Sequence, residues 1–258
     1  MRTRLLLPIL VAALCLLGAA LAHGELSQSG NVRIAFSGDF KPSALPRERP
    51  APISVHVEGA IGTTDGTHPP PVRKVEIALN RNGRLTTAGL PTCTSAQLQS
   101  TSTETARRRC ASSIVGRGRF GADVEFPTTP FPAGGRILAF YGIHQGGPAV
   151  LLHLYGTTPV QTTFVLPLRI TRPEKGKFGT VLSARVPTLA GGSGSVTEID
   201  LRIGRTYSYR GQRRSFISAA CAAPSGFTVA VFPLVRGSFF FADGRRIDTT
   251  LTRNCRVR

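Results

Sequence analysis

The sequence predicts an all-β protein of sandwich-like architecture, with two packed β units and one short helix held between Cys93 and Cys110. Three observations support this fold class. Apolar and polar residues alternate along many short segments, as expected of half-buried strands. Turn-forming residues separate these segments at intervals of about 8 to 12 residues. The chain of 258 residues also contains 28 glycines and 19 prolines but no tryptophan, which suits short strands and tight turns better than long helices.

Residues 1–22 have the features of a secretory signal peptide. Two arginines precede an apolar stretch over 5–21, and Ala20-Leu21-Ala22 forms a small-x-small cleavage site before His23. A membrane anchor is the alternative, but the stretch is at the lower length limit for crossing a bilayer and contains Pro8. We therefore expect cleavage, export to the cell envelope or medium, and no transmembrane segment in the mature chain.

The first strands are predicted from alternation. Residues 23–30 look like a loose leader. In the segment 53–61, His56 and Glu58 lie on the polar face and valine and isoleucine on the other. The strands predicted in this part of the chain are 31–40, 53–61 and 72–79.

Residues 94–109 are predicted to form the helix. Thr94 and Gln97 resemble a capping box at its start, and three arginines at 107–109 suit the negative end of the helix dipole. Cys93 and Cys110 flank the segment, so a disulfide between them would tie both of its ends.

From residue 113 onward, strands follow one another with glycine-rich turns between them. Two runs, 164–166 and 239–241, are apolar at every position, and we expect them to be buried between two layers. The predicted strands are 113–126, 136–143, 148–155, 162–171, 177–187, 195–204, 214–220, 226–235, 237–242 and 245–253.

Four cysteines remain after signal cleavage, and an oxidising environment would pair them. Three pairings are possible. We favour Cys93–Cys110 and Cys221–Cys255, because each pair lies within one half of the chain. A zinc site at the cysteines is disfavoured, since no CxxC spacing occurs and no histidine lies near them.

The two halves, 23–160 and 161–258, are predicted to form separate β units. The segment 75–79 resembles 197–201, and each is followed by a Gly-Arg turn and then by two cysteines. Chance similarity between two amphipathic strands is the alternative explanation.

The formal net charge is +18, from 32 Lys and Arg against 14 Asp and Glu. Such a surface attracts polyanions, so anionic envelope polymers or lipid headgroups are the expected partners. Nucleic-acid binding is not predicted, because the basic clusters are short and no recognised binding module accompanies them. The preference for arginine over lysine is also typical of a GC-rich genome.

The segment 116–121, Gly-Arg-Gly-Arg-Phe-Gly, has the letters of a dinucleotide-binding fingerprint. That mechanism requires a helix to begin at the glycines, whereas the residues that follow alternate as a strand. We expect a glycine-rich strand with a bulge, and no cofactor.

Candidate catalytic groups are few. Asp123 with Glu125, and Glu198 with Asp200, are i, i+2 pairs that would share a strand face, so the paired-carboxylate geometry of a glycosidase is possible, but solvent-facing strand residues give the same arrangement far more often. His144 and His153 could face each other across a hairpin, without a third metal ligand. The segment 191–195 does not match the serine hydrolase elbow. We therefore assign no catalytic, cofactor-binding or metal-binding residue from the sequence.

Several segments of the chain are familiar as a set: Gly89-Leu90-Pro91-Thr92-Cys93, Cys110, Val115-Gly116-Arg117-Gly118, Phe164-Val165-Leu166-Pro167, Tyr207-Ser208-Tyr209-Arg210-Gly211, Arg214-Ser215, Cys221, Phe241-Ala242-Asp243-Gly244 and Thr250 to Cys255. Together they resemble a family of exported, β-rich proteins from high-GC Gram-positive soil bacteria, for which no function is known. The resemblance implies export and a β-rich fold, and it transfers no active-site residue. Ala111 and Ala222 follow cysteines where the family carries proline.

Three functions remain in view. The leading expectation is a non-enzymatic exported protein that acts in the envelope or medium by binding or structure. The second is a carrier of a lipid or other hydrophobic ligand, suggested by the strands that are apolar on both faces. The third is a secreted hydrolase that uses the paired carboxylates.

Overall fold

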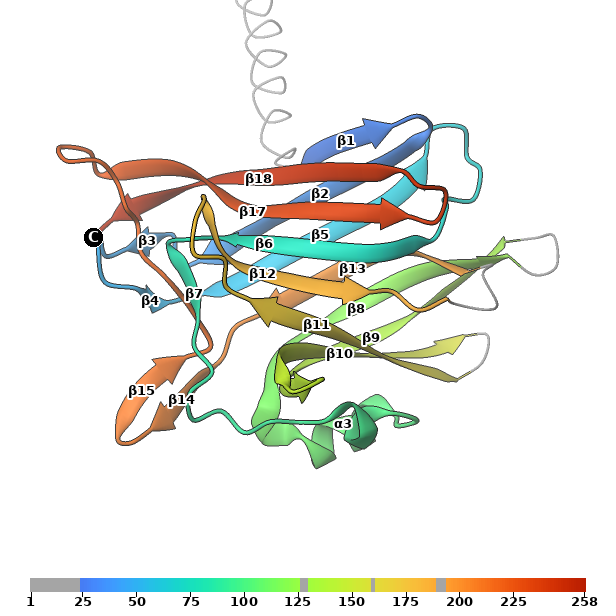
Figure 1. Cartoon of the computed structure of the whole chain (residues 1–258), viewed down its shortest axis with the longest axis horizontal. Coiled ribbons are helices and arrows are strands. Elements are labelled where there is room, and N and C mark those ends of the chain that lie inside the picture. The colour runs from blue at the N-terminus through green and yellow to red at the C-terminus, as the bar shows by residue number, and fades with distance from the viewer. Residues whose placement is uncertain (1–23, 126–129, 159–160, 189–193) are drawn as a thin grey trace, which may run out of the picture.

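The computed structural model describes residues 24–125, 130–158, 161–188 and 194–258, and the predicted signal peptide lies outside these residues (Figure 1). The helices among these residues are short: α2 (Ser95–Leu98) and α3 (Thr103–Arg109), followed by the 3-10 turn η1 (Ala111–Ser113). Strands make up the other regular structure described, which confirms the all-β class. They are β1 (Glu25–Ser29), β2 (Val32–Lys41), β3 (Ala44–Leu45), β4 (Ala51–Pro52), β5 (Ser54–Thr63), β6 (Val72–Asn80), β7 (Gly83–Leu85), β8 (Ile114–Glu125), β9 (Pro130–His144), β10 (Gly147–Thr158), β11 (Thr162–Thr171), β12 (Phe178–Arg185), β13 (Gly194–Ile203), β14 (Thr206–Tyr209), β15 (Gln212–Ser215), β16 (Ile217–Ala219), β17 (Val229–Phe241) and β18 (Arg246–Val257).

Most of the described strands form one 13-stranded sheet, in the order β1-β2-β5-β13-β8-β9-β10-β11-β12-β6-β17-β18-β3. The short strand β3 is parallel to β18, and the other pairs in this sheet are antiparallel. The sheet curls until β1 contacts β18 (Figure 1). Arg245, just before β18, links the two ends: it donates to the carbonyl oxygen of Ser29 at 3.2 Å and to Oδ1 of Asn31 at 2.7 Å.

The hydrophobic core lies between the facing parts of the curled sheet. Along β2, every second side chain points inward, and Ile34, Phe36 and Phe40 are buried. The ring of Phe36 meets the ring of Phe239 on β17 edge-on, with centroids 6.3 Å apart. The ring centroids of Phe40 and Phe232 are 6.0 Å apart. Each buried ring stabilises the fold by about 1.5–3 kcal/mol. This face-to-face packing is the sandwich-like arrangement that the alternation predicted.

The helices cover the outer face of β9, β10 and β11. Leu98 and Ala106 pack there against Phe140 and Leu151, in a second apolar cluster that Val165 adjoins. The neighbours of Val165 in sequence pack against the main core instead. The run 164–166 therefore lies between two layers, as predicted, although its three side chains are only partly buried.

The run 239–241 differs from the run 164–166, because no second layer among the described residues packs on its outer face. Phe239 and Phe241 belong to the main core, but Phe240 points outward. Its ring lies between two cations, with Nζ of Lys74 at 4.9 Å and the guanidinium of Arg246 at 5.1 Å from its centre. Cation–π contacts, rather than a second layer, cover this ring.

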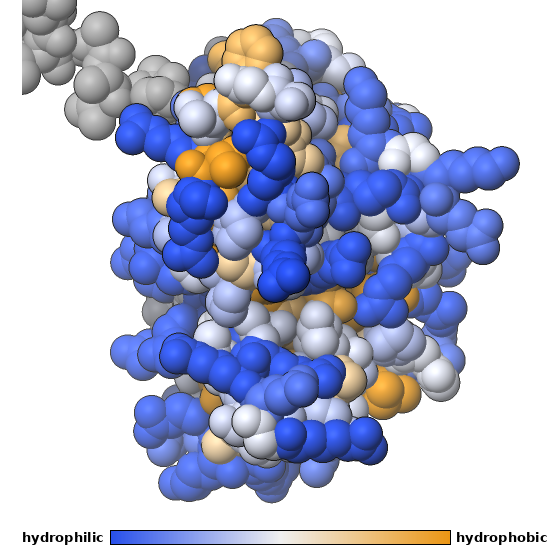
Figure 2. Space-filling model, turned by 90° about the vertical axis from the view of Figure 1, so that its left-hand side faces the viewer, coloured by the Kyte–Doolittle hydropathy of each residue, from blue (hydrophilic) through white to orange (hydrophobic). Residues whose placement is uncertain are grey.

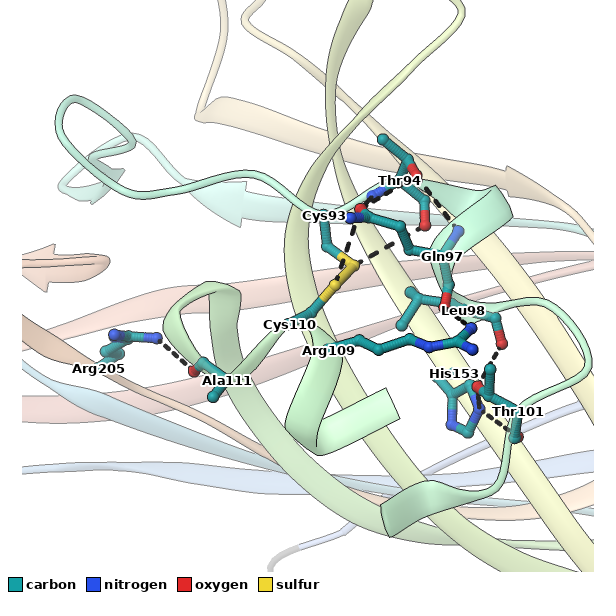
Figure 3. Close-up of a disulfide and its surroundings, with 10 residues drawn as sticks. All are labelled: Cys93, Thr94, Gln97, Leu98, Thr101, Arg109, Cys110, Ala111, His153 and Arg205. Carbon is teal, nitrogen blue, oxygen red and sulfur yellow. Dashed lines mark hydrogen bonds between the residues drawn. A yellow bond between two sulfur atoms is a disulfide. The ribbon is translucent and has the colours of Figure 1, made fainter. Parts of the chain in front are cut away.

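Both predicted disulfides are present, Cys93–Cys110 and Cys221–Cys255, each with a Cα–Cα distance of 5.8 Å. Figure 3 shows the first bridge beside the capping box of α2, where Thr94 and Gln97 bond to each other's backbone N–H, as the sequence predicted. The disulfides are consistent with an oxidising location.

The helical segment between Cys93 and Cys110 is confirmed, but it is interrupted. After Leu98 the backbone leaves the helix, and Ser100 has a φ of 53°. Ser102 then caps α3, its Oγ accepting a hydrogen bond from the backbone N–H of Thr105. The break turns Thr101 toward His153 (Figure 3).

The strand boundaries show further differences. The predicted loose leader contains β1, because Ser29 pairs with Val32 across a tight turn and the alternate residues continue the pairing. The predicted strands 226–235 and 237–242 are one strand, β17, with a bulge between Pro233 and Val235. The predicted strand 214–220 is divided between β15 and β16, and β14 was not predicted.

The two halves of the chain share the large sheet. Strand β13, from the second half, lies between β5 and β8 of the first half, and β6 lies between β12 and β17. The predicted units 23–160 and 161–258 thus contribute neighbouring strands to one sheet and residues to one main core.

Among the described residues, no helix has the length and apolar character needed to cross a membrane.

Candidate functional site

One row of outward-facing side chains crosses six adjacent strands. Strand register alone aligns these residues, because each lies opposite the next on the neighbouring strand. The row, called here the polar row, has two adjacent carboxylates beside two adjacent guanidinium groups, with a hydroxyl group at each end. Its members are Ser37 on β2, Glu58 on β5, Asp200 on β13, Arg119 on β8, Arg136 on β9 and Tyr155 on β10.

The polar row lines an open pocket with a volume of about 1050 Å³. Small residues, Ala35, Ala60 and Gly121, leave space beside the row, and Glu198 lies next to Asp200 on the same face of β13. The segment 102–104, at the start of α3, lines another part of the pocket. The lining therefore combines carboxylates, guanidinium groups and hydroxyls on a rigid sheet.

His56, two residues from Glu58 on the same face of β5, adds to this network. Its Nε2 lies 2.8 Å from Oδ1 of Asp200 and 3.6 Å from Oε1 of Glu58. Nη2 of Arg119 donates to Oδ2 of Asp200 at 3.3 Å, and Oγ of Ser37 donates to Oε2 of Glu58 at 2.9 Å. The hydrogen bond from His56, and then that from Arg119, hold the pKa of Asp200 below its ordinary value. Asp200 is accordingly ionised at neutral pH.

The carboxylate pairs predicted from the sequence have different positions. Glu198 and Asp200 both line the pocket. Asp123 and Glu125 lie further along β8 and do not line it; Asp123 is opposite Ser195, and Glu125 is exposed.

Glu58 is the carboxylate that the sequence did not pair with any other. Alternation placed His56 and Glu58 on one strand face, but their neighbour Asp200 is 142 residues further along the chain. Only knowledge of which strands are adjacent could have joined them.

The two hairpin histidines do not face each other, which excludes the paired arrangement that the hairpin allowed. His144 lies at the turn, opposite Gly147, and His153 lies opposite Leu138. His153 is fully buried under the helices, where Nε2 binds the carbonyl oxygen of Thr101 at 2.9 Å and its Oγ1 at 3.1 Å. Burial lowers the pKa of His153.

The fingerprint segment 116–121 lies within strand β8, as predicted, and a bulge between Ile114 and Gly116 directly precedes it. Its glycines allow close approach of β13. A Cβ at Gly118 would lie 2.0 Å from the carbonyl oxygen of Asp200, and one at Gly116 would lie 2.6 Å from that of Arg202. Strand packing explains these glycines. Most of the segment 191–195, considered as a hydrolase elbow, lies outside the described residues.

A strongly polar surface covers the end of the molecule that carries β3, β4 and the β14–β15 hairpin. Figure 2 shows this end with mostly hydrophilic side chains and small apolar areas between them. On the hairpin, Arg210 and Arg214 both lie over the ring of Tyr209, at 5.3 and 5.2 Å. The exposed arginines of these elements and their neighbours are Arg49, Arg84, Arg210, Arg213, Arg256 and Arg258.

Comparison with known proteins finds no matching family model, curated protein or solved structure.

Proposed function

We propose that the protein is exported and acts without catalysis, by binding an anionic, hydroxyl-rich polymer of the cell envelope or medium in the pocket of the polar row. The observation that carries this proposal is the arrangement of that row, with carboxylates, guanidinium groups and hydroxyls on one rigid surface. Arg119 and Arg136 suit the negative groups of such a polymer, and Glu58, Glu198 and Asp200 suit its hydroxyl groups.

The net charge of the protein supports the same ligand class. Summed positive charge raises the local concentration of polyanions and speeds their association. The arginines at the β14–β15 end extend the basic surface beyond the pocket. A polymer longer than the pocket gains affinity from such added contacts, whereas the affinity of a hydrophobic ligand is not increased by a charged lining.

The proposal can be tested with soluble polymers. We expect the protein to bind a uronic-acid polysaccharide or a polyol-phosphate polymer, and to bind a neutral glucan more weakly. The variants Arg119→Gln and Arg136→Gln should each reduce affinity about tenfold, the effect of losing a charge-assisted hydrogen bond of about 1.4 kcal/mol. Isothermal titration at two salt concentrations measures both effects.

Arg117→Gln is the matched control, because Arg117 lies on the same strand and face but does not line the pocket. Its affinity should stay within about twofold of the unmodified protein, because an exposed charge that does not contact the ligand contributes little in salt. Equal losses in all three variants would show that only overall charge matters. Absence of binding to any polymer would refute the proposal.

A second candidate function, a polysaccharide hydrolase, is favoured by one observation: Glu198 and Asp200 lie in the same pocket. Glycoside hydrolysis requires two carboxyl groups on either side of the scissile bond. Asp200, kept ionised, would be the nucleophile or base and Glu198 the acid. If so, Glu198→Gln and Asp200→Asn abolish release of reducing sugar, and Asp123→Asn and Glu125→Gln do not. Unchanged turnover in all four variants would exclude this function.

A further inference from the structure

His56, Glu58 and Asp200 bring three potential metal-binding atoms together beside the pocket. Nε2 of the histidine and one oxygen of each carboxylate all lie within 4.8 Å of one another. The arrangement follows from strand geometry: His56 and Glu58 are two residues apart on one face of β5, and Asp200 is opposite Glu58 on β13. We propose that this triad is a zinc-binding site.

The neighbours of the triad orient its ligand atoms. Ser37 binds Oε2 of Glu58 at 2.9 Å, and Arg119 binds Oδ2 of Asp200 at 3.3 Å. Each of these bonds engages the carboxylate oxygen that does not face His56. The other oxygens, Oε1 of Glu58 and Oδ1 of Asp200, are therefore the atoms that approach Nε2 of His56. Outer partners hold carboxylate ligands of protein metal sites in the same way.

The ligand set selects the metal. One imidazole nitrogen and two carboxylate oxygens are ligands that zinc accepts, and zinc sites with three protein ligands keep a fourth position for water or substrate. Calcium requires six to eight oxygens, and magnesium requires octahedral oxygen coordination. The fourth position would be available to an oxygen of a molecule in the adjoining pocket.

The positive charge of Arg119 opposes cation binding, and the two carboxylates outweigh it. Zinc–ligand bonds are about 2.0–2.2 Å long, so the ion would replace the present hydrogen bond between His56 and Asp200. Small side-chain rotations suffice for this exchange, since the three side chains are partly exposed and not held in the core.

The test uses tag-free, oxidised protein, because a polyhistidine tag binds zinc. Titration calorimetry with Zn²⁺ at neutral pH should give one site per chain. Co²⁺, a spectroscopic substitute, should give visible absorption bands typical of low coordination number. His56→Gln, Glu58→Gln and Asp200→Asn should each weaken Zn²⁺ binding at least about tenfold.

Glu198→Gln is the matched control, since it removes the same charge from the same face of β13 outside the triad. It should leave Zn²⁺ affinity within about threefold. Thermal melting verifies that each variant is folded, and His56→Gln retains a side chain able to hydrogen-bond Asp200. No Zn²⁺ binding by the unmodified protein, full binding by His56→Gln, or equal losses in Glu198→Gln and Asp200→Asn would each overturn the site. Arg136→Gln distinguishes the two proposals, because it should weaken polymer binding and leave zinc binding unchanged.

Discussion

His153 is fully buried beneath the helices, and one of its two ring nitrogens is left without a hydrogen-bond partner. Nε2 must carry a proton to donate to the carbonyl oxygen of Thr101. Nδ1 has no partner, so a second proton there would be a buried, unsatisfied donor. Tyr155 stacks beside the ring without supplying a charge, with centroids 6.5 Å apart. The folded protein therefore favours the neutral imidazole.

This environment predicts a stability that depends on pH. Burial lowers the pKa of His153 in the folded state, whereas the unfolded chain binds the proton near pH 6.5. The contribution is fully present above that pH and is lost as the pH falls below it, by at most about 1.4 kcal/mol per pH unit. Denaturant unfolding between pH 7.5 and 5 measures the loss. His153→Gln, which keeps a donor for Thr101, should remove this part of the pH dependence, and His144→Gln should not. An unchanged pH profile in His153→Gln between pH 7.5 and 5 would contradict the assignment to His153.

Aspartates whose pKa is lowered affect the stability of the fold in a different pH range, below that of His153. The side chain of Arg245 lowers the pKa of Asp243, so the stability it provides is lost only as the pH falls below its ordinary pKa of 3.8.

Gly118 is a second position where one residue decides local structure. Alanine there would place its Cβ 2.0 Å from a backbone oxygen of β13, which cannot move aside as a flexible side chain can. We expect Gly118→Ala to lower the free energy of unfolding by more than about 2 kcal/mol. Gly62→Ala on β5 is the control, since its Cβ would have nothing within 4 Å. Equal unfolding midpoints for the two variants would contradict the packing argument.

At the scale of elements, the segment between Cys93 and Cys110 behaves as one cover over the outer face of β9, β10 and β11. Its two helices are too short to be stable alone. They are fixed by apolar contacts through Leu98 and Ala106, and by the disulfide. Arg109 adds a bond from the end of α3 to the carbonyl oxygen of Gln97 on α2, at 3.3 Å (Figure 3).

Removing this disulfide should therefore loosen the cover. Its sequence separation is 17, for which loop closure predicts a loss of about 3 kcal/mol in Cys93→Ala/Cys110→Ala. The separation of 34 in the second bridge predicts a loss of nearly 4 kcal/mol in Cys221→Ala/Cys255→Ala. Hydrogen exchange should show the first loss at residues 95–109 and leave β17 and β18 protected. Deprotection of the whole sheet instead would mean that the cover is required for the fold.

At the scale of the whole molecule, the order of strands creates the pocket. The polar row gathers residues from positions 37 to 200, and β13 in the middle of the row connects carboxylates from opposite halves of the chain. Neither half contains the site alone. Expression of 23–160 alone would leave β5 and β8 without the strand that joins them, and expression of 161–258 alone would leave β13 without both of its neighbours.

The proposed export leads to a prediction for the intact protein. Protein recovered from the medium of an exporting host should begin at His23 and contain no free thiol. Peptide mass mapping should find the links Cys93–Cys110 and Cys221–Cys255. An N-terminus at Met1 would contradict signal cleavage, and free thiols would contradict export to an oxidising compartment.

The sequence by itself determined the local features: the alternation that makes strands, the capping box at Thr94, the cysteine pairs within each half and the shared strand face of His56 and Glu58. These follow from neighbours in the chain, which sequence spacing records. It missed β1 and β14, whose alternation is weak and polar, because their pairing with adjacent strands holds them in place.

Only the tertiary structure decided which strands are neighbours. Loop lengths and periodicity do not encode sheet order, and a sheet of many antiparallel strands admits many orders with similar local patterns. The meeting of Glu58 with Asp200, the burial of His153 under the helices and the pocket along the polar row all depend on that order. The chemistry of the site thus comes from contacts between distant segments, which pack together only when the whole sheet curls around its core.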